Sequence, residues 1–269
     1  MEQHRTVTVD GRTVHYRDEG RDHTHTLVLL HGFLQNLDVW SSYVLSYMNH
    51  LRVITVDLPG HGLSDSFCDV HTMDFMARVV KDVLADAGVD QCVMVGHSMG
   101  GYVALAFAEK YPYSLRGLGL ISSHAMADSE QHRLAREEAC RQVEANRASY
   151  IVGFIPSLFD DSRQAGLSKE IKDLQEQCLL TAAQAVIAAQ RGMAQRPSRI
   201  GLLQNIDVPV LFVYGKNDPR IPLEVALSQT MLPRHAEVHL LDSVGHMPFI
   251  EEREYVKPRL ANFVANCYL

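Results

Sequence analysis

The most constraining feature of the sequence is the pentapeptide Gly-His-Ser-Met-Gly at residues 96–100. An apolar, β-branched run precedes it, and a helix-forming run that opens with a second glycine follows it. This order predicts a strand, a sharp turn and a helix. A serine at such a turn sits in strained backbone geometry, and Gly96 and Gly100 let strand and helix approach without side-chain clash. A glycine-rich turn without chemistry is one interpretation; the flanking runs favour the other, that Ser98 is a nucleophile.

A serine hydroxyl is a poor nucleophile unless a base removes its proton and a third group orients that base. Asp218 follows a buried-type strand at 209–215, and His246 lies on a loop beyond a second strand at 237–241. We therefore predict Asp218 as the orienting acid and His246 as the base. Asp128, which follows the preceding strand, is the alternative acid.

Apolar runs alternate with helical stretches along most of the chain. A hairpin is expected at 5–9 and 13–17, because Asp-Gly at 10–11 is a turn signal. Further strands are predicted near 26–30, 52–56, 92–96, 115–122, 210–214 and 236–241, and helices near 37–49, 71–87, 98–110, 222–231 and 249–266. Strands separated by helices indicate a largely parallel sheet covered on both faces, with ligands bound beyond the strands' carboxyl ends.

Two further motifs complete a resemblance that covers nearly the whole chain. His-Gly-Phe at 31–33 and Asp-Leu-Pro-Gly-His-Gly-Leu-Ser-Asp at 57–65 resemble turns of the α/β-hydrolases. The chain order serine, aspartate, histidine is also that of this family's triad. The resemblance implies an α/β fold with a mostly parallel eight-stranded sheet, helices on both faces and an inserted helical cap. It also implies that the backbone amides of Phe33 and Met99 hold the developing oxyanion, and that their side chains line the acyl pocket.

The alternation breaks between about residues 125 and 199, where the sequence is strandless and rich in helix formers. This stretch looks like the family's cap, inserted after the sixth strand. We therefore predict a core of residues 1–124 and 200–269 and a cap of residues 125–199. The predicted cap has ten acidic and ten basic residues, so no gross charge attracts a charged substrate. Its apolar run at 150–159 could face the active site, pack on the core or form a dimer contact.

Composition limits the possible partners and compartments. The net charge is −7 over 269 residues, which argues against nucleic acid as a partner. Five widely spaced cysteines without a C-x-x-C pair fit reduced thiols in the cytoplasm. No run approaches the roughly 20 apolar residues of a membrane span. We expect no metal site, since the His23 and His25 pair has no further ligand nearby, and we expect no cofactor and a monomer or homodimer.

These observations predict a cofactor-independent serine hydrolase that cleaves a carboxylic ester or related small acyl substrate through an acyl-enzyme. The alternatives are a carbon–carbon bond hydrolase or lyase on the same fold, similar to the meta-cleavage-product hydrolases, and a ligand-sensing receptor. The menaquinone-pathway synthases are less similar, because this chain has Tyr102 where that family carries an arginine. A serine nucleophile also disfavours the dehalogenase and epoxide-hydrolase branches. Without that arginine, we expect uncharged acyl groups to be preferred.

Overall fold

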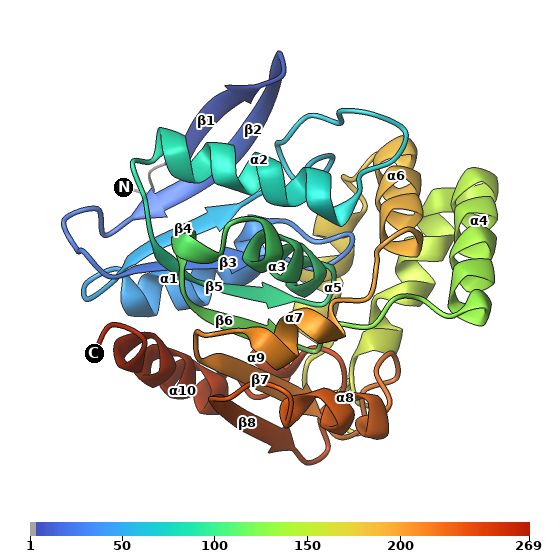
Figure 1. The fold of residues 1–269 in the computed structure, drawn as a ribbon. Helices are drawn as coiled ribbons and strands as arrows, with labels where there is room; N and C mark the ends of the chain where they lie inside the picture. Colours follow the sequence, from blue (N-terminus) through green and yellow to red (C-terminus); the bar gives the residue numbers. More distant parts are fainter. Residues whose placement is uncertain (1–3) are drawn as a thin grey trace.

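The computed structural model describes residues 4–269 and has eight strands in one sheet (Figure 1). Their order across the sheet is β1-β2-β4-β3-β5-β6-β7-β8. The strands are β1 (His4–Val9), β2 (Arg12–Glu19), β3 (Thr26–Leu30), β4 (Arg52–Val56), β5 (Cys92–His97), β6 (Leu115–Ile121), β7 (Val210–Gly215) and β8 (Ala236–Leu241). β2 pairs antiparallel with β1 and β4, and the other neighbouring strands within residues 4–269 pair parallel. The predicted mostly parallel, eight-stranded sheet is confirmed.

The first two strands form the hairpin that the Asp-Gly signal predicts. Val9 pairs with Arg12, and the two residues between them have positive φ angles, 49° at Asp10 and 75° at Gly11. Two left-handed residues in a row match the right-handed twist of the flanking strands. A local turn signal therefore sets the register of this edge of the sheet.

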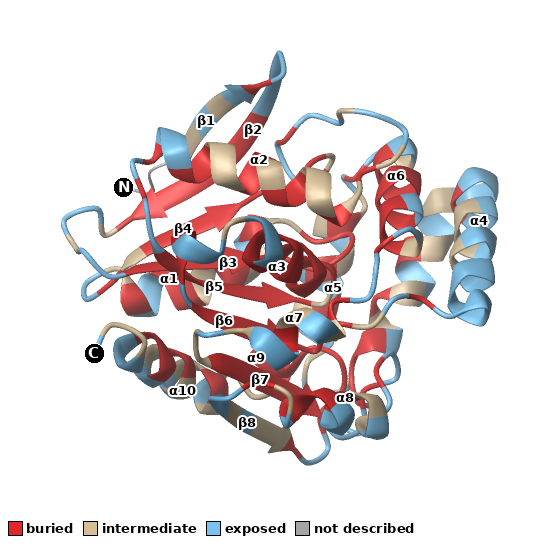
Figure 2. Cartoon of the chain, in the orientation of Figure 1, coloured by how far each residue is buried: buried red, intermediate tan, exposed pale blue. Residues whose placement is uncertain are grey.

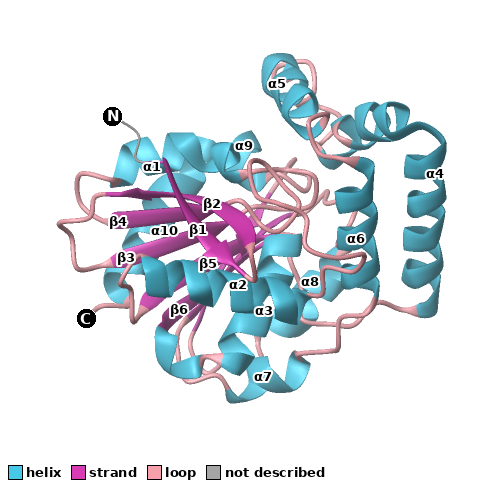
Figure 3. Cartoon of the chain, turned by 90° about the horizontal axis from the view of Figure 1, so that it is seen from above, coloured by secondary structure: helices cyan, strands magenta, loops and turns pink. Residues whose placement is uncertain are grey.

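Helices cover both faces of the sheet (Figure 3). α2 and α3 pack together on one face, whereas α1 lies on the opposite face beside α10. The helices outside the stretch from β6 to β7 are α1 (Ser41–Tyr47), α2 (Met73–Asp86), α3 (Met99–Lys110), α8 (Leu223–Thr230), α9 (Pro248–Glu251) and α10 (Arg253–Asn266).

Two predicted helices are divided in the structure. The first, expected at 37–49, is a short 3-10 turn, η1 (Leu37–Trp40), followed by α1. The second, expected at 249–266, is split into α9 and α10 by Glu252, whose φ of −129° and ψ of 45° are not helical. No glycine or proline stands between 249 and 257, so the sequence pattern carries no sign of this break.

Between β6 and β7, the described chain has helices and no strand. These are α4 (Glu130–Phe154), η3 (Pro156–Leu158), α5 (Ser168–Cys178), α6 (Ala183–Ala194) and α7 (Ile200–Asn205). Ser129 caps α4 by accepting a hydrogen bond from the amide of His132, 3.2 Å away. α6 is largely buried, whereas most of α4 faces solvent at the end of the molecule (Figures 1 and 2).

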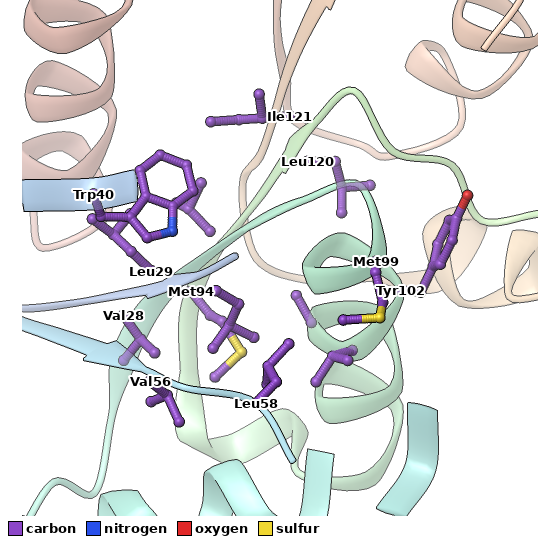
Figure 4. Close-up of a cluster of buried hydrophobic side chains, with 14 of the residues drawn as sticks. Val28, Leu29, Trp40, Val56, Leu58, Met94, Met99, Tyr102, Leu120 and Ile121 are labelled. Carbon is purple, nitrogen blue, oxygen red and sulfur yellow. The ribbon is translucent and has the colours of Figure 1, made fainter. Parts of the chain in front are cut away.

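The core lies along the central strands, and β3 and β5 are buried over their whole length. Side chains from several elements meet there, among them Val28, Met94 and Leu120 (Figure 4). Full burial of both faces explains why these strands are continuous apolar runs. Within residues 4–269, no helix combines the length and the apolar character that crossing a membrane requires.

Candidate active site

Ser98 sits on the sharp turn between β5 and α3, with a φ of 50° and a ψ of −115°. The positions around Ser98 are glycines because a Cβ atom would clash with neighbouring atoms there. A Cβ on Gly96 would lie 2.2 Å from the backbone of Gly100, and a Cβ on Gly100 would lie 2.5 Å from the carbonyl oxygen of Leu30. A Cβ on Gly101 would be 2.3 Å from the Ser123 Oγ. The glycine pattern thus holds a strained serine at the carboxyl end of β5.

The structure brings Ser98, His246 and Asp218 together in one hydrogen-bonded chain. The Nε2 of His246 is 2.9 Å from the Oγ of Ser98, and its Nδ1 is 2.9 and 2.8 Å from the two carboxylate oxygens of Asp218. These residues follow β5, β8 and β7, so all three lie beyond the carboxyl ends of parallel strands. Asp128, the alternative acid, pairs instead with Arg136 and Arg196.

Asp218 is held in the charged form that can orient a histidine. Burial by itself would raise the pKa of its carboxyl group, but His246 and two backbone amides lower the pKa below its usual range. Those amides belong to Arg220 and Ile221, which donate to the Oδ1 atom at 2.8 and 3.0 Å. A fixed carboxylate on Nδ1 directs the lone pair of Nε2 toward the Ser98 hydroxyl.

The loop that carries His246 is fixed by hydrogen bonds to two residues, Glu251 and Leu158, that the sequence did not indicate. Glu251 turns its carboxylate back onto the amides of Gly245 and Met247, both 3.0 Å away. The amide of His246 itself donates to the carbonyl of Leu158 at 2.7 Å. η3, within the helical stretch between β6 and β7, therefore helps to position the base.

Buried neutral histidines brace the loops beneath the site. His31 joins two turns, since its Nε2 accepts from the amide of Leu58 at 3.0 Å. The Nε2 of His97 lies 2.9 Å from the carbonyl oxygen of His246. Burial lowers the pKa of His97 and of His61 to about 3 in each case, so both rings stay uncharged at neutral pH.

We expect the protein to lose stability in mild acid because of these rings. A histidine whose pKa is about 3 when folded and 6.5 when unfolded binds more protons unfolded, so the free energy of unfolding falls as the pH drops below 6.5. At pH 5.5 the loss is about 1.4 kcal/mol for each such ring. Urea unfolding at pH 7.5 and 5.5 measures it. His61→Asn keeps a donor for the carbonyl of Pro59 but cannot titrate, so its loss should be smaller than that of the wild type by that amount.

The exposed His50 provides the matched control for this measurement. His50→Asn should show the same loss as the wild type between the two pH values. An equal loss in His61→Asn and the wild type would contradict the assignment of His61 as a buried neutral ring.

The backbone amides of Phe33 and Met99 lie on the two turns beside Ser98. β3 and β5 are in register at Leu30 and Gly96, so the turn that follows β3 abuts the turn that follows β5. Within residues 4–269 neither amide donates to a hydrogen bond. Met99 is also the first residue of α3, where a helix presents free N–H groups and its positive dipole end.

The side chains of Phe33 and Met99 were both expected to line the acyl pocket, but only that of Phe33 does so. Phe33 lines the cavity above Ser98, as predicted. Met99 is fully buried among hydrophobic core side chains and does not line that cavity (Figure 4). The prediction was wrong for Met99 because the first turn of α3 directs this side chain into the core.

A cavity of about 260 Å³ opens above Ser98 and His246. Tyr150 and Phe154 of α4 line it, so part of the apolar run at 150–159 faces the site. Asn146, which has non-helical backbone angles, interrupts α4 just before this part, and its side chain accepts from the amide of Ser149 at 3.0 Å.

Sequence reasoning missed several polar lining residues: His124, Arg136, Gln190 and Arg220. Only Arg220 had a signal, because it stands two residues after Asp218.

No cluster of three or more histidine, cysteine or carboxylate side chains that could hold a metal ion is found in the described part of the chain. His25 stacks on the ring of Tyr268, with 4.2 Å between ring centroids. This histidine therefore takes part in surface packing.

Known proteins resemble this chain in sequence and in fold. Residues 27–257 match the alpha/beta hydrolase family. The chain is 28% identical to a 2-hydroxy-6-oxononadienedioate/2-hydroxy-6-oxononatrienedioate hydrolase of Paraburkholderia phymatum, over 93% of this chain and 90% of that protein. It is 24% identical to the monoacylglycerol lipase ABHD6 of Homo sapiens, over 98% and 85% of the two chains. A malate-bound structure of a thermophilic esterase from Thermogutta terrifontis superimposes with a TM-score of 0.91 at 27% identity, and the match covers 100% of both chains.

The chain belongs to the alpha/beta hydrolase family. The predicted family, the fold and the general class of enzyme, a hydrolase, are therefore confirmed.

Proposed function

We propose that this protein is a serine hydrolase that cleaves carboxylic esters of small molecules through an acyl-enzyme. The observation that carries the proposal is the continuous hydrogen-bonded chain from Ser98 through His246 to Asp218 at the floor of a cavity. A ligand-sensing receptor needs a cavity but has no need of this hydrogen-bonded chain. The backbone of Ser98 is strained, and such strain is typical of residues that take part in catalysis. The names of the relatives, which include an esterase and a lipase, support the same class.

The residues supply each step of ester cleavage. The Oγ of Ser98 attacks the carbonyl carbon while the Nε2 of His246 takes the hydroxyl proton. The carbonyl oxygen becomes an oxyanion between the amides of Phe33 and Met99, each worth about 3 kcal/mol in comparable sites. The C–O bond then breaks, and the alcohol leaves with the proton from His246. Water attacks the acyl-enzyme by the same route and releases the acid and free Ser98.

A carbon–carbon hydrolase is the second candidate. It is favoured by the similarity to the oxononadienedioate hydrolase of Paraburkholderia phymatum, which covers most of both chains. The same triad can serve either reaction, because in both a carbonyl group is attacked before the bond next to it breaks. The nature of the scissile bond therefore has to be tested with substrates.

A substrate panel separates the two candidates. We expect the purified protein to cleave p-nitrophenyl esters with a kcat/KM at least tenfold above that for a vinylogous 1,5-diketone, which is about 1.4 kcal/mol. Release of p-nitrophenol and loss of the dienol absorbance give the two rates. Cleavage of the diketone alone would overturn the ester proposal in favour of the carbon–carbon hydrolase.

We also propose that residues 125–199 act as a cap on a core of residues 1–124 and 200–269. Support comes from the position of α4 and α6 over the cavity and from the backbone contact of Leu158 with the His246 loop.

A cytoplasmic location is proposed as well, because all five cysteines are free thiols. A monomer or homodimer and a lack of nucleic-acid partners stay predictions.

A further inference from the structure

The cavity above Ser98 is lined by more positive than negative charge. Arg136 and Asp128 both line it, and the Asp128 carboxylate is shared between Arg136 and Arg196, which does not line the cavity, at 2.5 and 2.6 Å. The Asp128 and Arg196 side chains are each 2% exposed, so one buried carboxylate faces two guanidinium groups. This wall of the cavity therefore keeps one uncompensated positive charge.

Arg220 adds a second guanidinium group to the lining of the cavity, and it has no ion-pair partner among the described residues. Within residues 4–269, no carboxylate lies within ion-pair distance of its guanidinium group. Its Nη2 donates to the Ser157 hydroxyl at 2.8 Å, and its guanidinium carbon lies 4.6 Å from the centre of the Phe154 ring. Arg220, Tyr150 and Phe154 line both this cavity and an outer groove beside α4, which places Arg220 at the mouth of the cavity.

The two arginines line the same cavity and repel each other electrostatically. Burial lowers the pKa of the Arg220 guanidinium from its ordinary value, the charges of Tyr150 and Asp218 oppose this shift, and the positive charge of Arg136 adds to it. An anionic group bound in this cavity would be attracted by both guanidinium groups. The one carboxylate that lines the outer groove, Glu138, is already paired with Arg141 at 2.7 Å.

We infer that Arg220, at the mouth of the cavity, binds a carboxylate carried by the substrate at the end of its acyl chain, and that the positive charge of Arg136 in the cavity lining favours this binding. This inference rests on the proposed ester hydrolase function and names the substrate class: half-esters of dicarboxylic acids. The ester group lies at Ser98, and the free carboxylate lies at the rim, where solvent still reaches Arg220.

The lining between these two points fits an apolar chain. Phe33 and Phe154 meet edge to face with 5.9 Å between ring centroids, and Ala135, Ala139 and Ile221 also line the cavity. The hydroxyl of Tyr150 accepts from the side-chain amide of Gln190 at 3.2 Å, so its own hydrogen is free to donate to an anion. The cavity thus offers apolar contacts first and charged donors at its mouth.

This substrate class differs from the uncharged acyl groups expected from the sequence. That expectation counted the charges of residues 125–199, which balance, and the missing arginine at Tyr102. The structure distributes these charges unevenly, because Arg136 points into the cavity and Arg220 comes from outside that stretch.

Matched substrates test the inference. The p-nitrophenyl half-ester of adipic acid is compared with its methyl ester, which has nearly the same shape and no charge. We expect the wild type to prefer the carboxylate by at least tenfold in kcat/KM. The preference should fall to about onefold in Arg220→Gln and be partly retained in Arg220→Lys, which keeps the charge. Arg234→Gln, an exposed arginine that does not line the cavity, should retain the full preference.

The outcomes separate this inference from the proposed function. Equal kcat/KM values for the two esters in the wild type, or an unchanged preference in Arg220→Gln, would overturn the carboxylate subsite while ester cleavage stands. If neither ester is cleaved above the rate of Ser98→Ala, the proposed hydrolase function itself fails.

Discussion

Ser98→Ala should reduce ester turnover by roughly 10⁶-fold, to a rate set by the remaining binding and oxyanion contacts. The hydroxyl is the only group of the triad that forms a bond to the substrate, so nothing nearby can replace it. Alanine needs the same left-handed backbone conformation as serine and removes no packing atom beyond the oxygen, so the fold should persist. Steady-state kinetics and a thermal melt of the variant give both results.

Ser122 provides a matched control for this substitution. It also ends a strand, has a positive φ of 43° and is buried, but its hydroxyl has no hydrogen-bond partner among the described residues. Ser122→Ala should therefore keep turnover close to that of the wild type. Comparable loss in Ser122→Ala and Ser98→Ala would mean that the removal of any buried hydroxyl at a strand end impairs turnover, and would contradict a special role of the Ser98 hydroxyl.

Asp218→Asn should reduce kcat by about 10⁴-fold while leaving the melting temperature nearly unchanged. The amide side chain keeps the shape of the carboxylate. It does not stabilise a positive charge on His246, and it can donate to Nδ1 and so favour the wrong tautomer. The measurement is kcat for a p-nitrophenyl ester across pH 5 to 9.

Substitutions of two further aspartates serve as controls for the loss of kcat in Asp218→Asn. Asp242→Asn removes an exposed carboxylate beyond β8 and should leave kcat unchanged. Asp128→Asn should act through the arginines that it leaves unpaired, and so on stability and on carboxylated substrates, with far less effect on kcat for neutral esters. A larger kcat loss in Asp128→Asn than in Asp218→Asn would move the acid to the end of β6.

The features that the sequence predicts well depend on a few residues that are close together in the chain. Gly96, Ser98 and Gly100 define the turn because the space around each glycine excludes a Cβ. Asp218 and His246 could be identified because each follows an apolar strand, and parallel strands bring their carboxyl ends to one edge of the sheet. The Asp-Gly hairpin was likewise predicted from two residues.

The features that the sequence does not predict depend on contacts between distant segments. Arg136 and Arg220 are 84 positions apart and line the same cavity only because α4 and the loop after β7 come together there. The same holds for Met99, whose side chain turns to the core instead of the cavity. The break at Glu252 also lacks a local signal. Packing directions of this kind are set by tertiary structure and do not appear in periodicity.

Covalent labelling tests the central claim, that Ser98 is a nucleophile activated by His246, most directly. The wild-type protein is incubated with a fluorophosphonate probe, and the adduct is located by mass spectrometry of the tryptic peptides. We predict one adduct, on Ser98, and slow or absent labelling when His246 is replaced by alanine. An adduct on another residue, or labelling that persists in Ser98→Ala, would contradict the claim.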